Sequence, residues 1–141
     1  MSTEETKAIA RRFSQEILSK GDLSLADQLL DPNYVNHNPI PGQVPGIEGF
    51  KKSAMGLRAA LPFEETIEDL IAEGDKVVVR VVRKATHSGA FMGIPASGKQ
   101  VTVPATYILR IVNGKITDAW LNWDLLGLMQ QLGAIPARTS G

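Results

Sequence analysis

Residues that could do chemistry gather near the end of the chain, in a segment whose polarity alternates as in a strand. Alternate side chains of an extended strand share a face, and one such set is Ile116, Asp118, Trp120, Asn122 and Asp124. A solvated face seldom carries Trp and a core face seldom carries Asp, so this mixture predicts the wall of a pocket with a polar floor. In the alternative interpretation, Asp118 faces water at a sheet edge and Asp124 caps the helix that follows.

Asp124 is the candidate for a catalytic acid or base. Trp120, Trp123 and Leu125 flank it, and their side chains would partly desolvate the carboxylate and make it a better proton acceptor. Removing a proton from a carbon next to a carbonyl also requires a group that stabilises the enolate oxygen. The candidates to position a substrate, or to take part in catalysis by donating a hydrogen bond to that oxygen, are Asn36, His37 and Asn122.

The sequence does not decide which way several other polar side chains point. Arg80 and Arg83 are three residues apart in a valine-rich strand, so they face opposite sides of the sheet and at most one can line a pocket. Valines flank both, so alternation does not decide between them, and both could instead extend over the surface of the sheet. The remaining candidate substrate-binding residues are Asp118, Trp120, Arg80 and Tyr107.

The residue types also limit metal and redox chemistry. His37 and His87 are the only histidines, and the chain has no cysteine. The spacing of the histidines matches no short metal-binding motif, so we predict no metal site, and a structural role is an alternative for each. The absence of cysteine excludes a disulfide framework, a thiol nucleophile and an iron–sulfur centre.

Composition narrows the class of protein further. The chain has 141 residues, 43% of them hydrophobic, which predicts a single domain over residues 1–141 with one core. Its 15 basic residues balance 15 acidic ones without a basic block, so we expect no nucleic-acid partner. The first residues lack the features of a signal peptide, and no apolar run approaches the roughly 20 residues that cross a membrane. We therefore expect a soluble cytoplasmic protein that does not bind membranes.

Periodicity predicts that helices come first and strands later. Apolar residues recur at helical spacing as far as Pro62, and the pattern then changes to alternation. The predicted helices cover residues 3–18, 24–30 and 46–61, a Pro- and Gly-rich loop follows Tyr34, and the predicted strands cover residues 66–73, 76–86, 101–112 and 115–123. This order predicts an α+β fold, with a curved, mainly antiparallel sheet wrapped around the N-terminal helices.

Several motifs, taken in the order in which they occur, resemble those of a known family. These motifs are Gly21–Leu23, Tyr34–Pro39, Ile71–Val77, Thr86–Pro95, Asn113–Asp124 and Gln131–Gly133. With them in this order, residues 5–135 resemble the SnoaL-like polyketide cyclases. The turn Pro95–Lys99 departs from the family's Pro-Thr-Gly-Lys pattern, which affects the shape of that turn rather than the fold.

The resemblance implies the cone-shaped α+β barrel that the family shares with nuclear transport factor 2 and ketosteroid isomerase. It also implies an intramolecular aldol step that closes a ring of an aromatic polyketide ester without metal or cofactor. Asp124 occupies the place of the family's acid/base aspartate. We therefore expect a cofactor-free enzyme of the lyase or isomerase type that acts on a hydrophobic carbonyl compound.

Two alternatives from other classes use the same scaffold. The first is a non-catalytic module that binds a hydrophobic small molecule. The second is an epoxide hydrolase with an Asp–Arg–Asp relay, which Asp118, Arg80 and Asp124 could form only if all three faced inward. Inward placement of Arg80 would favour hydrolysis, whereas a drier pocket would favour proton transfer from carbon.

The valine-rich strand also predicts how the chain assembles. Residues 77–82 are largely apolar on both faces of that strand, which indicates that the outer face of the sheet is covered as well. Members of the family commonly associate through these sheets. We therefore expect a homodimer or a higher homo-oligomer formed through the sheet.

Overall fold

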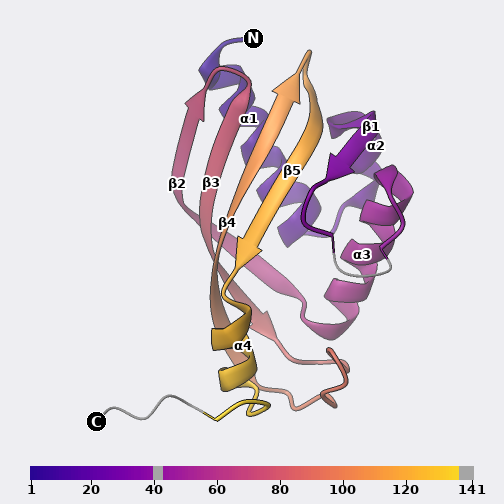
Figure 1. Cartoon of the computed structure of the whole chain (residues 1–141), viewed down its shortest axis with the longest axis vertical. Coiled ribbons are helices and arrows are strands. Elements are labelled where there is room, and N and C mark those ends of the chain that lie inside the picture. The colour runs from indigo at the N-terminus through magenta and orange to yellow at the C-terminus, as the bar shows by residue number, and fades with distance from the viewer. Residues whose placement is uncertain (40–42, 137–141) are drawn as a thin grey trace.

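A computed structural model places residues 1–39 and 43–136 of the chain. Within these residues, helices pack against one face of a curved five-stranded sheet (Figure 1). The Pro- and Gly-rich loop predicted after Tyr34 extends through residues 40–42, which lie outside the described residues.

The first helix begins where the sequence predicts. α1 (Thr3–Arg12) is preceded by Ser2, whose hydroxyl accepts a hydrogen bond from the backbone N–H of Glu5 at 3.1 Å. The carboxylate of Glu5 accepts in turn from the backbone N–H of Ser2 at 3.3 Å, which completes a capping box. A π-helical segment, Phe13–Ser19, continues α1.

Two shorter helical regions and one longer helix complete the helical layer. The predicted second helix is a 3-10 turn (Leu23–Leu25) followed by α2 (Ala26–Leu29), and the predicted third helix is α3 (Gly46–Ala60). In the part of the chain that the structure describes, no helix is both long and apolar enough to cross a membrane.

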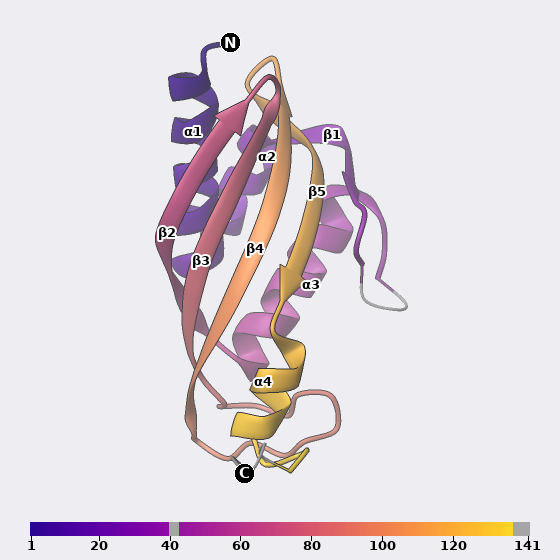
Figure 2. The same ribbon diagram turned by 60° about the vertical axis from the view of Figure 1, so that its left-hand side comes forward.

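The sheet is unclosed and has the strand order β1-β5-β4-β3-β2. Its strands are β1 (Leu30–Asn36), β2 (Phe63–Glu73), β3 (Lys76–Thr86), β4 (Gln100–Val112) and β5 (Lys115–Trp123). β1 runs parallel to β5, and all other neighbours are antiparallel. Figure 2 shows α1 and α3 on the same side of the sheet, and α4 (Leu125–Gln131) extending from the end of β5. The predicted α+β class and the curved, mainly antiparallel sheet are confirmed.

The sequence does not predict β1. Its residues Asp31-Pro32-Asn33 are typical of a turn, and proline lacks the N–H that a strand donates to its neighbour. The structure accommodates Pro32 because β1 is an edge strand, where such a donor is not required. The pairing of β1 with β5 is also irregular between Leu30 and Val35.

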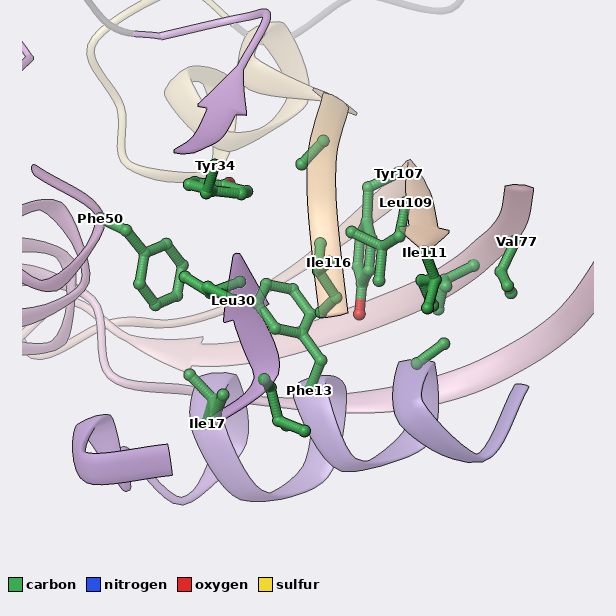
Figure 3. Packing of buried hydrophobic residues seen from close by; sticks show 14 of the residues in the cluster. Phe13, Ile17, Leu30, Tyr34, Phe50, Val77, Tyr107, Leu109, Ile111 and Ile116 are labelled. Atoms are coloured by element: carbon green, nitrogen blue, oxygen red, sulfur yellow. The ribbon is translucent and has the colours of Figure 1, made fainter. Parts of the chain in front are cut away.

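The core lies between the helices and the sheet (Figure 3). The ring of Phe13 lies 5.7 Å from that of Phe50 and 5.9 Å from that of Tyr107, measured between centroids. On β3, Val77, Val79 and Val81 are fully buried, whereas the residues between them are half-buried or exposed. We call the face of the sheet that carries these buried valines the inner face, and the opposite one the outer face.

Candidate functional site

A bulge in β5 separates the residues that the sequence places on one pocket wall. Ile111 pairs with Ile116, but Arg110 pairs with Asp118, so Thr117 is an extra residue in β5. Beyond this bulge, Ala119, Leu121 and Trp123 pack in the interior. Asp118, Trp120 and Asn122 alternate with them and point to the outer face, because the extra residue reverses the alternation. The predicted shared wall is therefore wrong.

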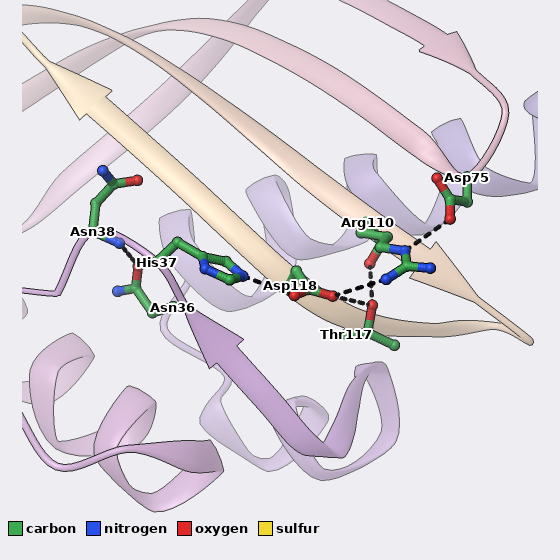
Figure 4. A network of polar contacts seen from close by, with 7 residues as sticks. All are labelled: Asn36, His37, Asn38, Asp75, Arg110, Thr117 and Asp118. Atoms are coloured by element: carbon green, nitrogen blue, oxygen red, sulfur yellow. Dashed lines mark hydrogen bonds and ion pairs between the residues drawn. The ribbon is translucent and has the colours of Figure 1, made fainter.

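Asp118 and His37 belong to a polar network on the outer face (Figure 4). Nε2 of His37 lies 2.8 Å from Oδ2 of Asp118, and its ring stacks on Trp120 with a centroid distance of 4.5 Å. Asp118 also accepts a hydrogen bond from the hydroxyl of Thr117 at 2.6 Å. These contacts with His37 and then Thr117 lower the pKa of the Asp118 carboxyl below its usual value. His37 therefore lies outside the core.

The same network extends to the neighbouring strands and to β1. Nη1 of Arg110 lies 3.9 Å from Asp118, and its Nε donates to Asp75 at 2.8 Å. Asn36, another predicted substrate-binding residue, accepts a hydrogen bond from the backbone N–H of Asn38 at 3.0 Å. Asn36 thus shapes the turn after β1, and Asp118 is not at a sheet edge, since β5 lies between β1 and β4.

Arg80, Asn122 and Asp124 come together on the outer side of the molecule, around a depression of about 230 Å³ that Thr106 also lines. The side chain of Arg80 is exposed and pairs with Asp69. Arg80 does not face inward and Asp118 is engaged elsewhere, so the Asp118–Arg80–Asp124 relay of an epoxide hydrolase is not assembled.

Asp124 caps α4. Its Oδ1 accepts a hydrogen bond from the backbone N–H of Gly127 at 2.9 Å, and the residue is exposed. The capping role, given above as the alternative interpretation, is therefore confirmed for this residue. Asp124 lies in the chain between Trp123 and Leu128, which both line an interior cavity at this end of the sheet.

A buried arginine is among the residues that line that cavity. The cavity has a volume of about 10 Å³, and Arg83 lines it together with Phe63, Trp123, Leu57, Leu61 and Leu128. The guanidinium carbon of Arg83 lies 4.4 Å from the centroid of the Phe63 ring and 5.8 Å from that of Trp123. Its side chain is only 5% exposed. Of the two arginines on β3, Arg83 is thus the one that faces inward.

A buried carboxylate holds Arg83 in place. Nε of Arg83 donates to Oε2 of Glu65 at 2.8 Å, and the side chain of Glu65 is fully buried. Oε1 of Glu65 accepts from the hydroxyl of Ser14 at 2.7 Å and from that of Tyr107 at 2.8 Å. Burial, followed by the charge of Glu65, raises the pKa of Tyr107 well above its usual value. Tyr107 therefore stays a neutral donor to Glu65, and it does not line the cavity.

Sequence reasoning missed Glu65, Ser14 and the inward direction of Trp123. Counting back from the Gly74-Asp75 turn would pair Thr66 with Arg83, but a register shift between Ile67 and Asp69 brings Glu65 opposite Arg83 instead. One signal was available in the sequence. Glu65 and Arg83 carry opposite charges and lie at nearly equal numbers of residues from that turn, as cross-strand partners do. Bulges are not visible in the alternation itself, so the pairing could not be fixed from the sequence.

The second histidine is buried. His87 is 0% exposed and its Nδ1 lies 2.8 Å from the hydroxyl of Ser97, whereas Nε2 has no hydrogen-bond partner among the described residues. Within the same residues, no group of three His, Cys, Asp or Glu side chains could hold a metal ion.

Comparisons with known proteins add to this geometry. The profile of the SnoaL-like polyketide cyclase family matches residues 8–132. The chain is 32% identical to the aklanonic acid methyl ester cyclase DnrD of Streptomyces peucetius over 75% of this chain and 72% of that protein. It is 29% identical to the nogalonic acid methyl ester cyclase of Streptomyces nogalater over 76% of this chain and 82% of that one. The structure of TsrD from Streptomyces laurentii superposes with a TM-score of 0.86 and 32% identity, covering 96% of this chain and 99% of TsrD.

Proposed function

Because this chain belongs to the SnoaL-like polyketide cyclase family, we propose that it is a cofactor-free cyclase, a single domain over residues 1–141 that works in the cytoplasm. Its reaction is an intramolecular aldol addition, the ring-closing step of an aldol condensation, on a hydrophobic carbonyl compound. Two relatives are named as cyclases of aklanonic acid methyl ester and nogalonic acid methyl ester, which supports an ester as the substrate. The observation that carries the proposal is the interior cavity, where aromatic and aliphatic walls surround one buried guanidinium.

Asp124 is the proposed acid and base of this reaction. It would take a proton from a carbon next to a carbonyl, and the enolate carbon would then attack a second carbonyl and form the new ring bond. The resulting alkoxide would be protonated, so that the product is an isomer of the substrate. Asp124 lines the outer depression together with Trp123, and Trp123 also lines the interior cavity, which supports this role. His37 is not part of the proposal, because its ring is already engaged by Asp118 and Trp120.

The test is the variant Asp124→Asn, because asparagine caps a helix about as well as aspartate and the variant should therefore fold. We would incubate both proteins with aromatic and alicyclic β-keto esters and measure product formation and ligand-induced shifts in melting temperature. Loss of turnover by at least about a hundredfold with the melting shift retained is the expected result. The matched control is Asp31→Asn, which removes the charge from a half-buried aspartate that also accepts a backbone N–H and should leave turnover unchanged.

Two other results would overturn parts of the proposal. Undiminished turnover in Asp124→Asn would remove the acid/base assignment while leaving a cyclase. Ligand binding by both proteins without any turnover would instead identify the chain as a non-catalytic module that holds a hydrophobic molecule.

We further propose that the chain forms a homo-oligomer through the outer face of the sheet. Val78, Val82 and Ile108 point to this face and remain half-buried in the isolated chain, so a second copy could bury them. Sedimentation at micromolar concentration should show a dimer or larger species for the natural chain and a monomer for Val78→Lys. Met55→Lys, which changes an exposed methionine on α3, is the control and should sediment like the natural chain. A monomeric natural chain would contradict the proposal.

A further inference from the structure

A side chain of α4 covers the edge of β4 that β5 leaves open. The pairing of β5 with β4 ends where Trp123 lies opposite Ala105, whereas β4 already begins at Gln100. At Thr102, the side-chain amide of Gln131 takes the place of a neighbouring strand. Its Oε1 accepts from the backbone N–H of Thr102 and its Nε2 donates to the backbone carbonyl, both at 2.9 Å. Gln131 thus satisfies both backbone groups that Thr102 presents to the open edge.

The same helix covers the interior cavity. Leu128 on α4 and Leu132 directly after it are buried and belong to one apolar cluster with Val101 and Val103 of β4. Of these four residues, all but Leu132 line the cavity. The main core is a different cluster, so α4 can move away from β4 without taking the main core apart.

The two ends of α4 are attached to β4 in different ways. At the start, the backbone N–H of Asp124 donates to the carbonyl of Pro104 at 3.0 Å, and the Asp124 carboxylate caps the helix. At the end, the attachment is the side chain of Gln131, whose hydrogen bonds with Thr102 are exposed. Water can replace exposed bonds when they break, so their net contribution to stability is small. The end of α4 is therefore easier to release than its start.

We propose that α4 is the gate through which the substrate enters the cavity, with Gln131 as its latch on β4 and the backbone at Asp124 as its hinge. This inference rests on the proposed function and deepens it, because it states how access to that site is controlled. Opening exchanges the two bonds of Gln131 for bonds to water and uncovers Val101 and Val103. A hydrophobic ester then replaces the leucines of α4 as the packing partner of these valines.

The gate gives a role to the motif Gln131–Gly133, which the family resemblance singled out but the proposed reaction does not use. Gln131 is the latch, and Leu132 packs behind it. Gly133 has a positive φ of 79°, a conformation that glycine adopts most readily, and its backbone N–H donates to the carbonyl of Gln130 at 3.1 Å. This turn ends the helix directly after the latch.

The test measures how often the cavity opens, with a cysteine as the probe, because the chain has no cysteine of its own. Val103→Cys places a thiol on the cavity wall, and Val77→Cys places one in the main core; Val103 is 2% exposed and Val77 0%. The reagent is 4,4′-dithiodipyridine, a neutral aromatic disulfide from which a thiolate displaces 4-thiopyridone, and absorbance follows the release. A buried thiol reacts only while the structure around it is open. With α4 unchanged, Val103→Cys should therefore react faster than Val77→Cys.

Removing the latch should accelerate only one of these reactions. Gln131→Leu deletes both hydrogen bonds and keeps a good helix former. In this background the labelling rate of Val103→Cys should rise about tenfold, while that of Val77→Cys stays unchanged. The matched control is Gln130→Leu, the same change at the neighbouring glutamine, whose side chain donates to the carbonyl of Pro136 at 3.5 Å. It should leave both labelling rates unchanged.

Three outcomes would overturn the gate. A rise in both labelling rates would show that Gln131 acts on the stability of the whole fold. An unchanged rate of Val103→Cys in Gln131→Leu would show that the latch does not control opening. Equal rates for the two cysteines with α4 unchanged would mean that the cavity opens only when the protein unfolds. No substrate or turnover enters this experiment, so a failure of the cyclase assignment is distinguishable from a failure of the gate.

Discussion

Glu65 is the residue on which the interior polar groups depend. Its fully buried carboxylate accepts hydrogen bonds from the π-helical segment, from β3 and from β4, through Ser14, Arg83 and Tyr107. A buried charge is tolerated only when it is paired and hydrogen-bonded. Each of these donors therefore contributes to stability as well as to the orientation of Arg83.

Tyr107→Phe tests this at one of the donors. The substitution leaves Oε1 of Glu65 with one hydrogen bond fewer, and the free energy of unfolding should fall by about 2 kcal/mol. The matched control is Tyr34→Phe, because Tyr34 is 5% exposed and Tyr107 3%, but the hydroxyl of Tyr34 has no partner among the described residues. Its effect should stay within about 0.5 kcal/mol. Urea unfolding measures both, and equal losses would contradict the importance of the Glu65 contact.

The lowered pKa of Asp118 predicts how the stability of the protein depends on pH. Its pKa in the folded protein is lowered, first by the hydrogen bond with His37, so the folded carboxyl holds its proton less tightly than the unfolded one. Its contribution to stability is therefore fully present above about pH 4, the ordinary value for aspartate, and is lost as the pH falls through the lower folded value. Asp118→Asn should cost about 1 kcal/mol near neutral pH. In urea unfolding at several pH values, this difference should shrink below about pH 4; a constant difference would show that charge is not its cause.

At the scale of elements, the start of α3 is held by a close backbone contact. A Cβ at Gly49 would overlap the carbonyl oxygen of Val44, whereas a Cβ at Gly56 on the same helix would meet nothing within 4 Å. Gly49→Ala should therefore displace the segment before α3 and cost more than about 2 kcal/mol. Gly56→Ala should stabilise the protein by about 0.5–1 kcal/mol, because alanine favours the helix. Thermal unfolding of the pair checks this, and similar shifts would contradict the contact.

The bounds of the strands could be predicted from the sequence, whereas the directions of several side chains could not. The bounds predicted for β3 and β5 match the structure, because short turns fix where these strands begin. One such turn is Asn113-Gly114, where both residues have positive φ, 51° and 79°, as a tight hairpin requires. The candidate site was predicted less well, since it depends on which way side chains point beyond the bulges at Thr117 and near Glu68. An extra residue reverses the alternation without leaving a mark in the polarity pattern.

At the scale of the whole molecule, the cavity is far smaller than the ligand it is proposed to receive. It measures about 10 Å³, whereas pockets for small molecules usually span about 300–1,000 Å³. A space of this size encloses about one water-sized group, so α3 and α4, which carry Leu57 and Leu128 of its lining, must move apart to admit the substrate. The cavity wall at α4 would change most, next to Trp123.

The two tryptophans allow this movement to be observed. Trp120 lies on the outer face and Trp123 lines the cavity, and the chain has no other tryptophan. In Trp120→Phe, the fluorescence of Trp123 should change when an alicyclic β-keto ester is added. In the matched variant Trp123→Phe, the signal of Trp120 should stay constant. A response confined to Trp120 would instead place binding beside His37, on which Trp120 stacks on the outer face.

The parallel pairing of β1 with β5 has a consequence for how the chain acquires its structure. β1 is made early in synthesis, yet its partner strand is the last of the five, and the contact between His37 and Asp118 spans 81 positions in the sequence. Contacts between such distant segments form slowly, because a long loop must close before they contribute. The first strand therefore cannot pair until β5 has been made, and until then its hydrogen-bonding edge remains open to other nascent chains.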